Sequence, residues 1–138
     1  MHYFKHTYIL LFVSFLAFTS CSKDNEAPST KSIIQQGKWK IVLFNDNGAV
    51  ETSNYSGYEF TFNTNGSVSA VKNGSTVTGN WNVGADENLN KITLSFPLLS
   101  ALTELNEQWT FLEKSYSVFK LEHINSEGQT EVVTFQKL

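Results

Sequence analysis

The sequence predicts an all-β protein: an eight-stranded antiparallel up-and-down barrel with one short helical or loop insertion. From residue 38 onward, apolar and polar residues alternate, which is the pattern of half-buried strands. Asn-Gly pairs at 65–66 and 73–74 supply the positive φ angles that tight hairpins require. Because consecutive strands joined by short hairpins can close on themselves and remove exposed edges, these two observations together favour a barrel.

Each expected strand is marked by apolar residues at alternate positions, rich in aromatic and β-branched types. In chain order these residues are Trp39, Ile41 and Leu43; Tyr58, Phe60 and Phe62; Val68 and Ala70; Val77, Gly79, Trp81 and Val83; Ile92, Leu94 and Phe96; Trp109 and Phe111; Phe119 and Leu121; Val133 and Phe135. Further turn signals stand at residues 46–48 and 127–128.

Two segments break the alternation. In Pro97–Asn106, leucines 98, 99, 102 and 105 recur at helical spacing, which predicts a short helix or capping loop. Residues 33–37 are expected to form a single helical turn that plugs one end of the barrel, and Gly37 should end it before the first strand.

The N-terminus has the features of an export signal. A short polar start containing Lys5 precedes an apolar run at 8–17, and the small residues Thr19 and Ser20 follow. This pattern predicts a signal peptide over residues 1–20, and the apolar run is shorter than the roughly 20 residues a spanning helix needs. Cys21, the only cysteine, then resembles the lipid-attachment cysteine of a bacterial lipobox, although Phe18 replaces the usual aliphatic residue. The alternative is an ordinary secreted protein in which this thiol has no role.

The residues after Cys21 bear on location. Ser22–Glu26 contains a lysine and two acids, and resembles the signal that sends lipoproteins to the outer surface of the outer membrane in Bacteroidetes-type bacteria. We therefore expect an outer-membrane lipoprotein, with the cell surface favoured over the periplasmic face. Residues 21–32 should be a flexible tether, and residues 33–138 one domain.

Composition limits the possible partners. Without residues 1–20 the chain has nine lysines, 13 acids and no arginine. Since arginine is the preferred residue for bidentate contacts to phosphate, nucleic acid is not an expected partner. An acylated Cys21 would leave no cysteine for disulfides, so the core alone must hold the domain. We expect a monomer attached to the membrane through its N-terminal lipid.

Several short motifs resemble lipocalins and, more closely, bacterial lipocalin-like lipoproteins. Gly37-Lys38-Trp39 is similar to the Gly-x-Trp motif that opens the first lipocalin strand, and matching runs occur at 58–68, 79–81, 108–111 and 133–137. The resemblance implies a barrel in which Trp39 packs across the bottom. The arginine that classical lipocalins place over this tryptophan is absent, and the resemblance implies a fold more than a function.

The sequence offers little for catalysis. His123 is the only histidine after residue 20, so no second histidine can help to build a metal site. The acid pairs Glu104/Glu107 and Asp86/Glu87 are typical of solvated loops. We therefore expect no cofactor, no metal and no enzymatic activity.

Three functions remain open. The aromatic residues Tyr58, Phe60, Trp81, Trp109 and Phe119 can line an apolar cavity, which predicts binding of a small apolar or weakly polar ligand at the end away from Trp39, with Pro97–Asn106 as a lid. The alternative is a structural or interaction domain with a filled barrel that contacts another envelope protein or a glycan, for example through Tyr55 and Tyr116. An enzyme would require a polar cluster around His123. An empty or a packed interior separates the first two hypotheses.

Overall fold

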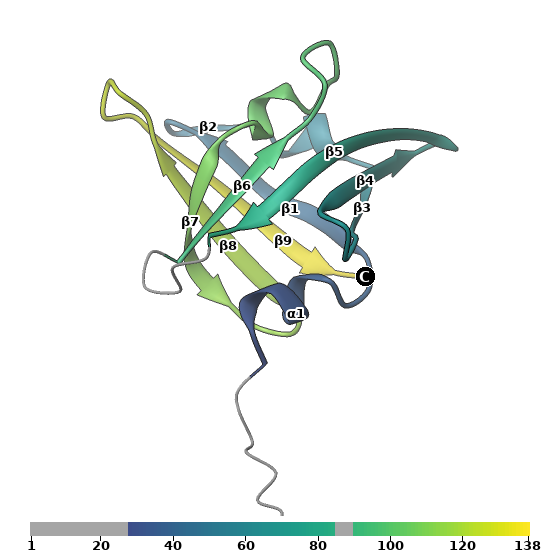
Figure 1. Cartoon of the computed structure of the whole chain (residues 1–138). Helices are drawn as coiled ribbons and strands as arrows, with labels where there is room; N and C mark the ends of the chain where they lie inside the picture. The colour runs from purple at the N-terminus through teal and green to yellow at the C-terminus, as the bar shows by residue number, and fades with distance from the viewer. Residues whose placement is uncertain (1–27, 85–89) are drawn as a thin grey trace, which may run out of the picture.

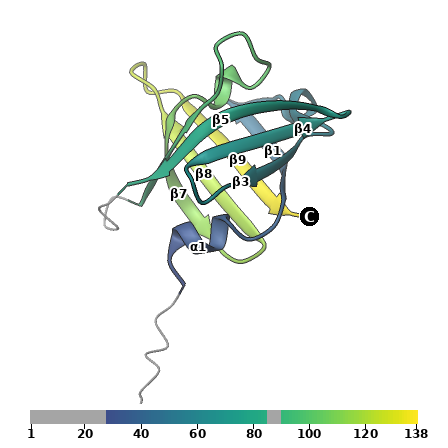
Figure 2. The same ribbon diagram turned by 45° about the vertical axis from the view of Figure 1, so that its right-hand side comes forward.

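A computed structural model describes residues 28–84 and 90–138. The expected signal peptide, Cys21, most of the tether and the Asp86/Glu87 pair lie outside the described residues. The described chain forms a closed antiparallel barrel (Figures 1 and 2), because the first long strand pairs with the last from Trp39–Lys137 to Asp46–Glu131. The predicted fold class is confirmed.

The strands follow one another around the barrel in chain order. Their bounds are β1 Trp39–Asp46, β2 Ala49–Val50, β3 Glu59–Phe62, β4 Ser67–Lys72, β5 Ser75–Val83, β6 Lys91–Ser95, β7 Gln108–Lys114, β8 Val118–Ile124 and β9 Thr130–Lys137. The two-residue β2 folds back on the far end of β1. The 3-10 helix η1 (Thr52–Tyr55) then leads to β3, which pairs with the near end of β1, so eight strands build the wall.

Of the two predicted Asn-Gly turns, 73–74 forms a tight hairpin, whereas at 65–66 only Gly66 has a positive φ angle, 83°, and residues 63–66 separate the strands. Asn73 and Gly74 have φ angles of 50° and 78° and join the paired residues Lys72 and Ser75. Asn47 and Gly48, with φ angles of 46° and 94°, join β1 to β2 in the same way. Two successive positive φ angles give the turn a twist that matches the flanking strands, which fixes their register.

A short helix closes one end of the barrel, but it spans Thr30–Ile34 and not the expected residues 33–37. α1 (Thr30–Ile34) begins where the hydroxyl of Ser29 accepts a hydrogen bond from the Ser32 amide, so it starts inside the expected tether. Ile34 is buried against the core, and Gly37, at φ 86°, turns the chain into β1. In the described ranges no helix has the length and apolar character needed to cross a membrane.

A β-bulge in β1 corrects the predicted inward face. The register against β9 shifts between Ile41 and Leu43, which leaves Leu43 opposite Thr134 on the outer face. Phe44 points inward in its place and is buried. The prediction that Leu43 shares the face of Trp39 is therefore wrong, because one extra residue reverses the alternation beyond it.

The loop at 97–106 covers the barrel end away from α1 (Figure 1). It consists of turns and a 3-10 helix, η3 (Thr103–Leu105). Leu102 and Leu105 are fully buried in the core, whereas Leu98 and Leu99 point into solvent. The expected capping loop is confirmed, with two of its four leucines inside.

Candidate functional site

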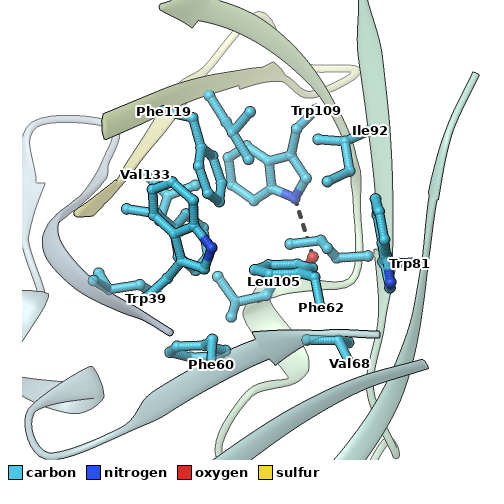
Figure 3. Close-up of a cluster of buried hydrophobic side chains, with 14 of the residues drawn as sticks. Trp39, Phe60, Phe62, Val68, Trp81, Ile92, Leu105, Trp109, Phe119 and Val133 are labelled. Atoms are coloured by element: carbon cyan, nitrogen blue, oxygen red, sulfur yellow. Dashed lines mark hydrogen bonds between the residues drawn. The ribbon is translucent and has the colours of Figure 1, made fainter. Parts of the chain in front are cut away.

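Most of the aromatic residues predicted to bind a ligand meet inside the barrel. Phe60, Trp81, Trp109 and Phe119 are buried and belong to one continuous core cluster, and Tyr58 lies half-buried against its edge. Figure 3 shows the labelled rings of Trp39, Phe60, Phe62, Trp109 and Phe119 gathered in the interior.

These rings pack directly on one another. Phe119 stacks on Phe135, with ring centroids 4.6 Å apart and an angle of 16° between planes. Trp39 meets Phe119 edge-on at 4.7 Å, and Phe62 does so at 5.9 Å. Offset-stacked and edge-on pairs at such distances are favourable in themselves, beyond the apolar area they bury. The aromatic rings thus form the packed core of the barrel.

The exposure of these side chains shows how complete the filling is. Phe60 and Trp109 have 0% of their surface accessible to water, and Phe119 has 1%. A side chain lining a cavity large enough for a water molecule would expose surface to that cavity. These three residues therefore line no space that could hold a small molecule.

The three indole N–H groups are also used internally. Trp39 Nε1 donates to the Ile34 carbonyl at 2.8 Å, Trp109 Nε1 to that of Leu105 at 3.0 Å, and Trp81 Nε1 to that of Asn63 at 3.0 Å. Within the described residues no buried side-chain nitrogen or oxygen lacks a hydrogen-bond partner. The interior consequently offers a ligand no free polar group to bind.

Polar residues instead gather at the barrel end that the 97–106 loop covers. His123 in β8 and Asp46 in β1 are both paired with Glu131 in β9, which lies two residues from the inward-facing Val133. Since paired residues point to the same side of a sheet, the three polar side chains continue the inward row at the rim.

His123 is held by two protein contacts. Its Nε2 lies 3.5 Å from Glu107 Oε2, and its Nδ1 lies 3.2 Å from the backbone oxygen of Gln108. The ring also meets Trp109 edge-on at 5.9 Å. A polar cluster around His123, which an enzyme would require, is therefore present. Both ring nitrogens face protein partners, however, so the histidine ties β8 to Glu107 and to Gln108, the first residue of β7.

The rim carboxylates affect one another. Partial burial raises the pKa of Glu131 above its ordinary value, and the charges of Asp46, Glu107 and Glu104 raise it further, against the opposing effect of His123. Burial, and then Glu104, raise the pKa of Tyr55, so its hydroxyl stays protonated and donates to Glu104 Oε2 at 3.1 Å. In residues 28–84 and 90–138 no three histidine, cysteine or acidic side chains are placed to hold a metal ion.

The 97–106 loop is firmly built. Asn106 accepts a hydrogen bond from the Phe96 amide and donates one to the Phe96 carbonyl at 2.9 Å, which clamps the base of the loop. Thr103 Oγ1 donates to the carbonyls of Ser100 at 2.6 Å and Leu98 at 3.1 Å. Beside the loop lies an open surface hollow of about 360 Å³, lined by Asn54, Ser100, Ala101, Thr103 and Glu104.

Sequence reasoning missed part of this arrangement. Tyr55 was expected to be exposed and able to stack on sugars, but it is buried, with its ring 4.8 Å from that of Phe44. The prediction fails because η1 folds this side chain under the rim. Tyr116, the other expected sugar contact, is exposed. In the sequence, His123 and Glu131 continue the alternation of Leu121 and Val133, but Asp46 is out of phase with Trp39 and Ile41, and only the bulge brings it to the inward face.

No family model and no curated protein matches this sequence. Among solved structures, the fold is similar to the crystal structure of a DUF4847 family protein from Bacteroides vulgatus ATCC 8482, with a TM-score of 0.56 and 14% identity over 80% of this chain and 98% of that one. A redesigned β barrel gives a TM-score of 0.46 and 16% identity over 79% of this chain and 95% of its own. At such low identity the first likeness concerns the fold alone.

Proposed function

We propose that this protein is a non-catalytic, lipid-anchored interaction domain of the cell envelope, which acts through its loops and not through its interior. The observation that carries the proposal is the filled barrel: the side chains of Phe60 and Trp109 expose no surface at all. A ligand in their place would have to displace packed rings. Truncating a buried aromatic side chain typically costs about 3–5 kcal/mol, so such displacement is unfavourable.

A second argument concerns orientation. Thr30, where α1 begins, follows Cys21 closely, and α1 lies at the barrel end opposite the 97–106 loop (Figure 2). Even a fully extended chain gains at most about 3.6 Å per residue, so a lipid on Cys21 would keep the α1 end within roughly 30 Å of the membrane. The tether attaches at the α1 end, so it leaves the rim and the 97–106 loop at the opposite end free to meet a partner. We place the protein in the outer membrane, with the cell surface as the favoured side.

The anchor is tested with Cys21→Ser. The wild-type chain, expressed in a Bacteroidetes host, should incorporate an acyl label and fractionate with the outer membrane, and the variant should do neither. An unlabelled wild-type chain, or a variant that stays in the membrane fraction, would contradict the lipid anchor. Protease accessibility of intact cells then distinguishes the outer face from the periplasmic one.

The filled interior is tested with small apolar probes. Neither benzene nor the neutral fluorophore N-phenyl-1-naphthylamine should raise the melting temperature of the wild-type domain, since a ligand stabilises only a state that binds it. Phe119→Ala provides the matched control, because the cavity it opens should accept benzene and restore part of the lost stability. Saturable stabilisation of the wild type by either probe would favour the ligand-binding hypothesis.

A further inference from the structure

We propose that one barrel end docks a second envelope protein whose binding site is an apolar pocket flanked by lysine or arginine side chains. This end, called the acidic end below, consists of segments 45–55, 97–107 and 123–131. Leu98 and Leu99 would enter the partner's pocket. The inference rests on the proposed function, because it names the surface and the partner chemistry of the interaction domain.

The three segments form one continuous surface. The Tyr55 hydroxyl bonds Glu104 and so joins the first segment to the second. His123 and Glu107, 3.5 Å apart, join the second to the third. The Asn47 amide donates to the carbonyl of Thr130 at 3.0 Å and joins the third to the first. A partner that lands on this end therefore meets a single connected face.

Two large apolar side chains protrude from it. Leu98 is 80% exposed, and Leu99 is exposed as fully as in an open chain. Adjacent exposed leucines are unusual on a loop whose other two leucines, Leu102 and Leu105, are completely buried. Apolar surface presented together at one tip is typical of a contact site, whereas scattered single exposed residues are not.

Hydrogen bonds order the backbone of the loop that carries these leucines. The Asn106 clamp on Phe96 holds its base, and the bonds from Thr103 Oγ1 hold its turn. A binding surface that is already ordered loses little conformational entropy on association, which favours affinity.

The charge of the three segments indicates that the partner is basic. The three segments carry Asp46, Glu51, Glu104, Glu107, Glu127 and Glu131, and they contain no lysine or arginine. Three lysines lie near α1 instead: Lys31 within it, Lys114, whose Nζ bonds Thr30 Oγ1, and Lys137, whose Nζ lies 5.6 Å from the Trp39 ring. Two others lie just outside the three segments: Lys72, with its Nζ 5.0 Å from the Tyr58 ring, and Lys91, with its Nζ bonded to Gln108 Oε1 at 3.3 Å. The potential of the acidic end favours a basic partner and opposes an anionic lipid surface.

The surface is located by photo-cross-linking. A benzophenone amino acid is introduced in place of Leu99 in the full-length chain, expressed in its host and irradiated in intact cells. Matched controls carry the same group in place of Leu112 on the barrel wall or Tyr116 near α1, both also exposed. Position 99 should give one discrete protein adduct that positions 112 and 116 do not give, and mass spectrometry identifies it.

Binding is then measured with the purified partner by calorimetry. Leu99→Ser should weaken binding at least about tenfold, as expected for a central apolar contact. Glu104→Gln and Glu107→Gln should each weaken it several-fold, and added salt should weaken the wild-type complex while affecting these two variants less. Leu112→Ser is the control that should leave the affinity unchanged. Since Leu99 is fully exposed, its replacement should not change the melting temperature.

The other outcomes overturn the inference in distinguishable ways. A protein adduct found only at position 112 or 116, or affinity unaffected by Leu99→Ser, would overturn this surface but leave an interaction domain. Adducts with lipid or with a second copy of this chain would replace the partner with a membrane or with self-association. The absence of any protein adduct at all three positions would contradict both the surface and the proposed function.

Discussion

Trp39 Nε1 donates a 2.8 Å hydrogen bond to the carbonyl oxygen of Ile34, which joins the start of β1 to the C-terminal residue of α1. Both residues are buried. Since the last carbonyls of a helix have no partner within it, this bond satisfies one of them and fixes the helix across the barrel end. Trp109 makes the equivalent bond to Leu105 at 3.0 Å, where the other end is covered.

Replacing Trp39 with phenylalanine should therefore release α1. The variant keeps a ring in the core but leaves the Ile34 carbonyl without its donor, which typically costs about 1–3 kcal/mol of unfolding free energy. Urea denaturation measures the loss of unfolding free energy. Hydrogen exchange should accelerate at the Gln35 and Gln36 amides, which donate to carbonyls of α1. Trp109→Phe is the matched control and should loosen the 97–106 loop instead. Equal effects of both variants at both ends would show that the indole bonds do not act locally.

Gly79 should not tolerate a side chain. A Cβ atom there would lie 2.4 Å from the Ser95 carbonyl oxygen and 2.7 Å from Cδ1 of Phe96. Gly79→Ala must push these groups apart, and overpacking of this kind typically costs about 1–3 kcal/mol. Thermal denaturation compares it with Gly84→Ala, where a Cβ would meet nothing within 4 Å. If the two variants have the same melting temperature, Gly79 does not lie as close to Ser95 and Phe96 as described here.

Stability should depend on pH through Glu131. Its folded-state pKa is raised by burial and by neighbouring acids, so the folded state holds the proton more tightly than the unfolded state, and ionisation at higher pH destabilises the fold. Glu131→Gln should therefore be more stable than wild type at about pH 8, and its advantage should shrink as the pH falls to about 4. Urea denaturation at several pH values measures this, with Glu127→Gln on the exposed hairpin as control. If the difference in unfolding free energy between Glu131→Gln and wild type is the same at every pH, the pKa of Glu131 is not raised in the folded state.

Asn106 should be the main support of the leucine-bearing loop. Asn106→Ala removes both bonds to the Phe96 backbone and leaves two half-buried groups unpaired, at a cost of about 1–3 kcal/mol. Amide exchange should accelerate in 97–106 and stay unchanged in β4 and β5. Asn54→Ala, which removes only an exposed bond to Glu51, should leave both regions unaltered. Unchanged exchange in the loop of the Asn106 variant would show that its order comes from Leu102 and Leu105 alone.

Much of the fold could be predicted from local patterns, because alternation and Asn-Gly turns are properties of short segments. The bulge beside Val42 could not, since one inserted residue leaves no mark in an alternating sequence. Tyr55 was misplaced because its burial depends on Phe44 and Glu104, which come from other segments. The polar rim likewise assembles from β1, β8, β9 and the 97–107 segment, and only the closed barrel brings these together. Filling of the interior could not be predicted either, because inward-facing aromatic residues suit both a cavity and a packed core.

The most direct test of the filled barrel is native mass spectrometry of the protein purified from its own host. We expect the mass of the mature chain with its covalent lipid, and no further mass that is lost when the protein is denatured. A small molecule that accompanies the folded protein in one-to-one ratio and is released on denaturation would contradict the account, and would show that the barrel binds a ligand.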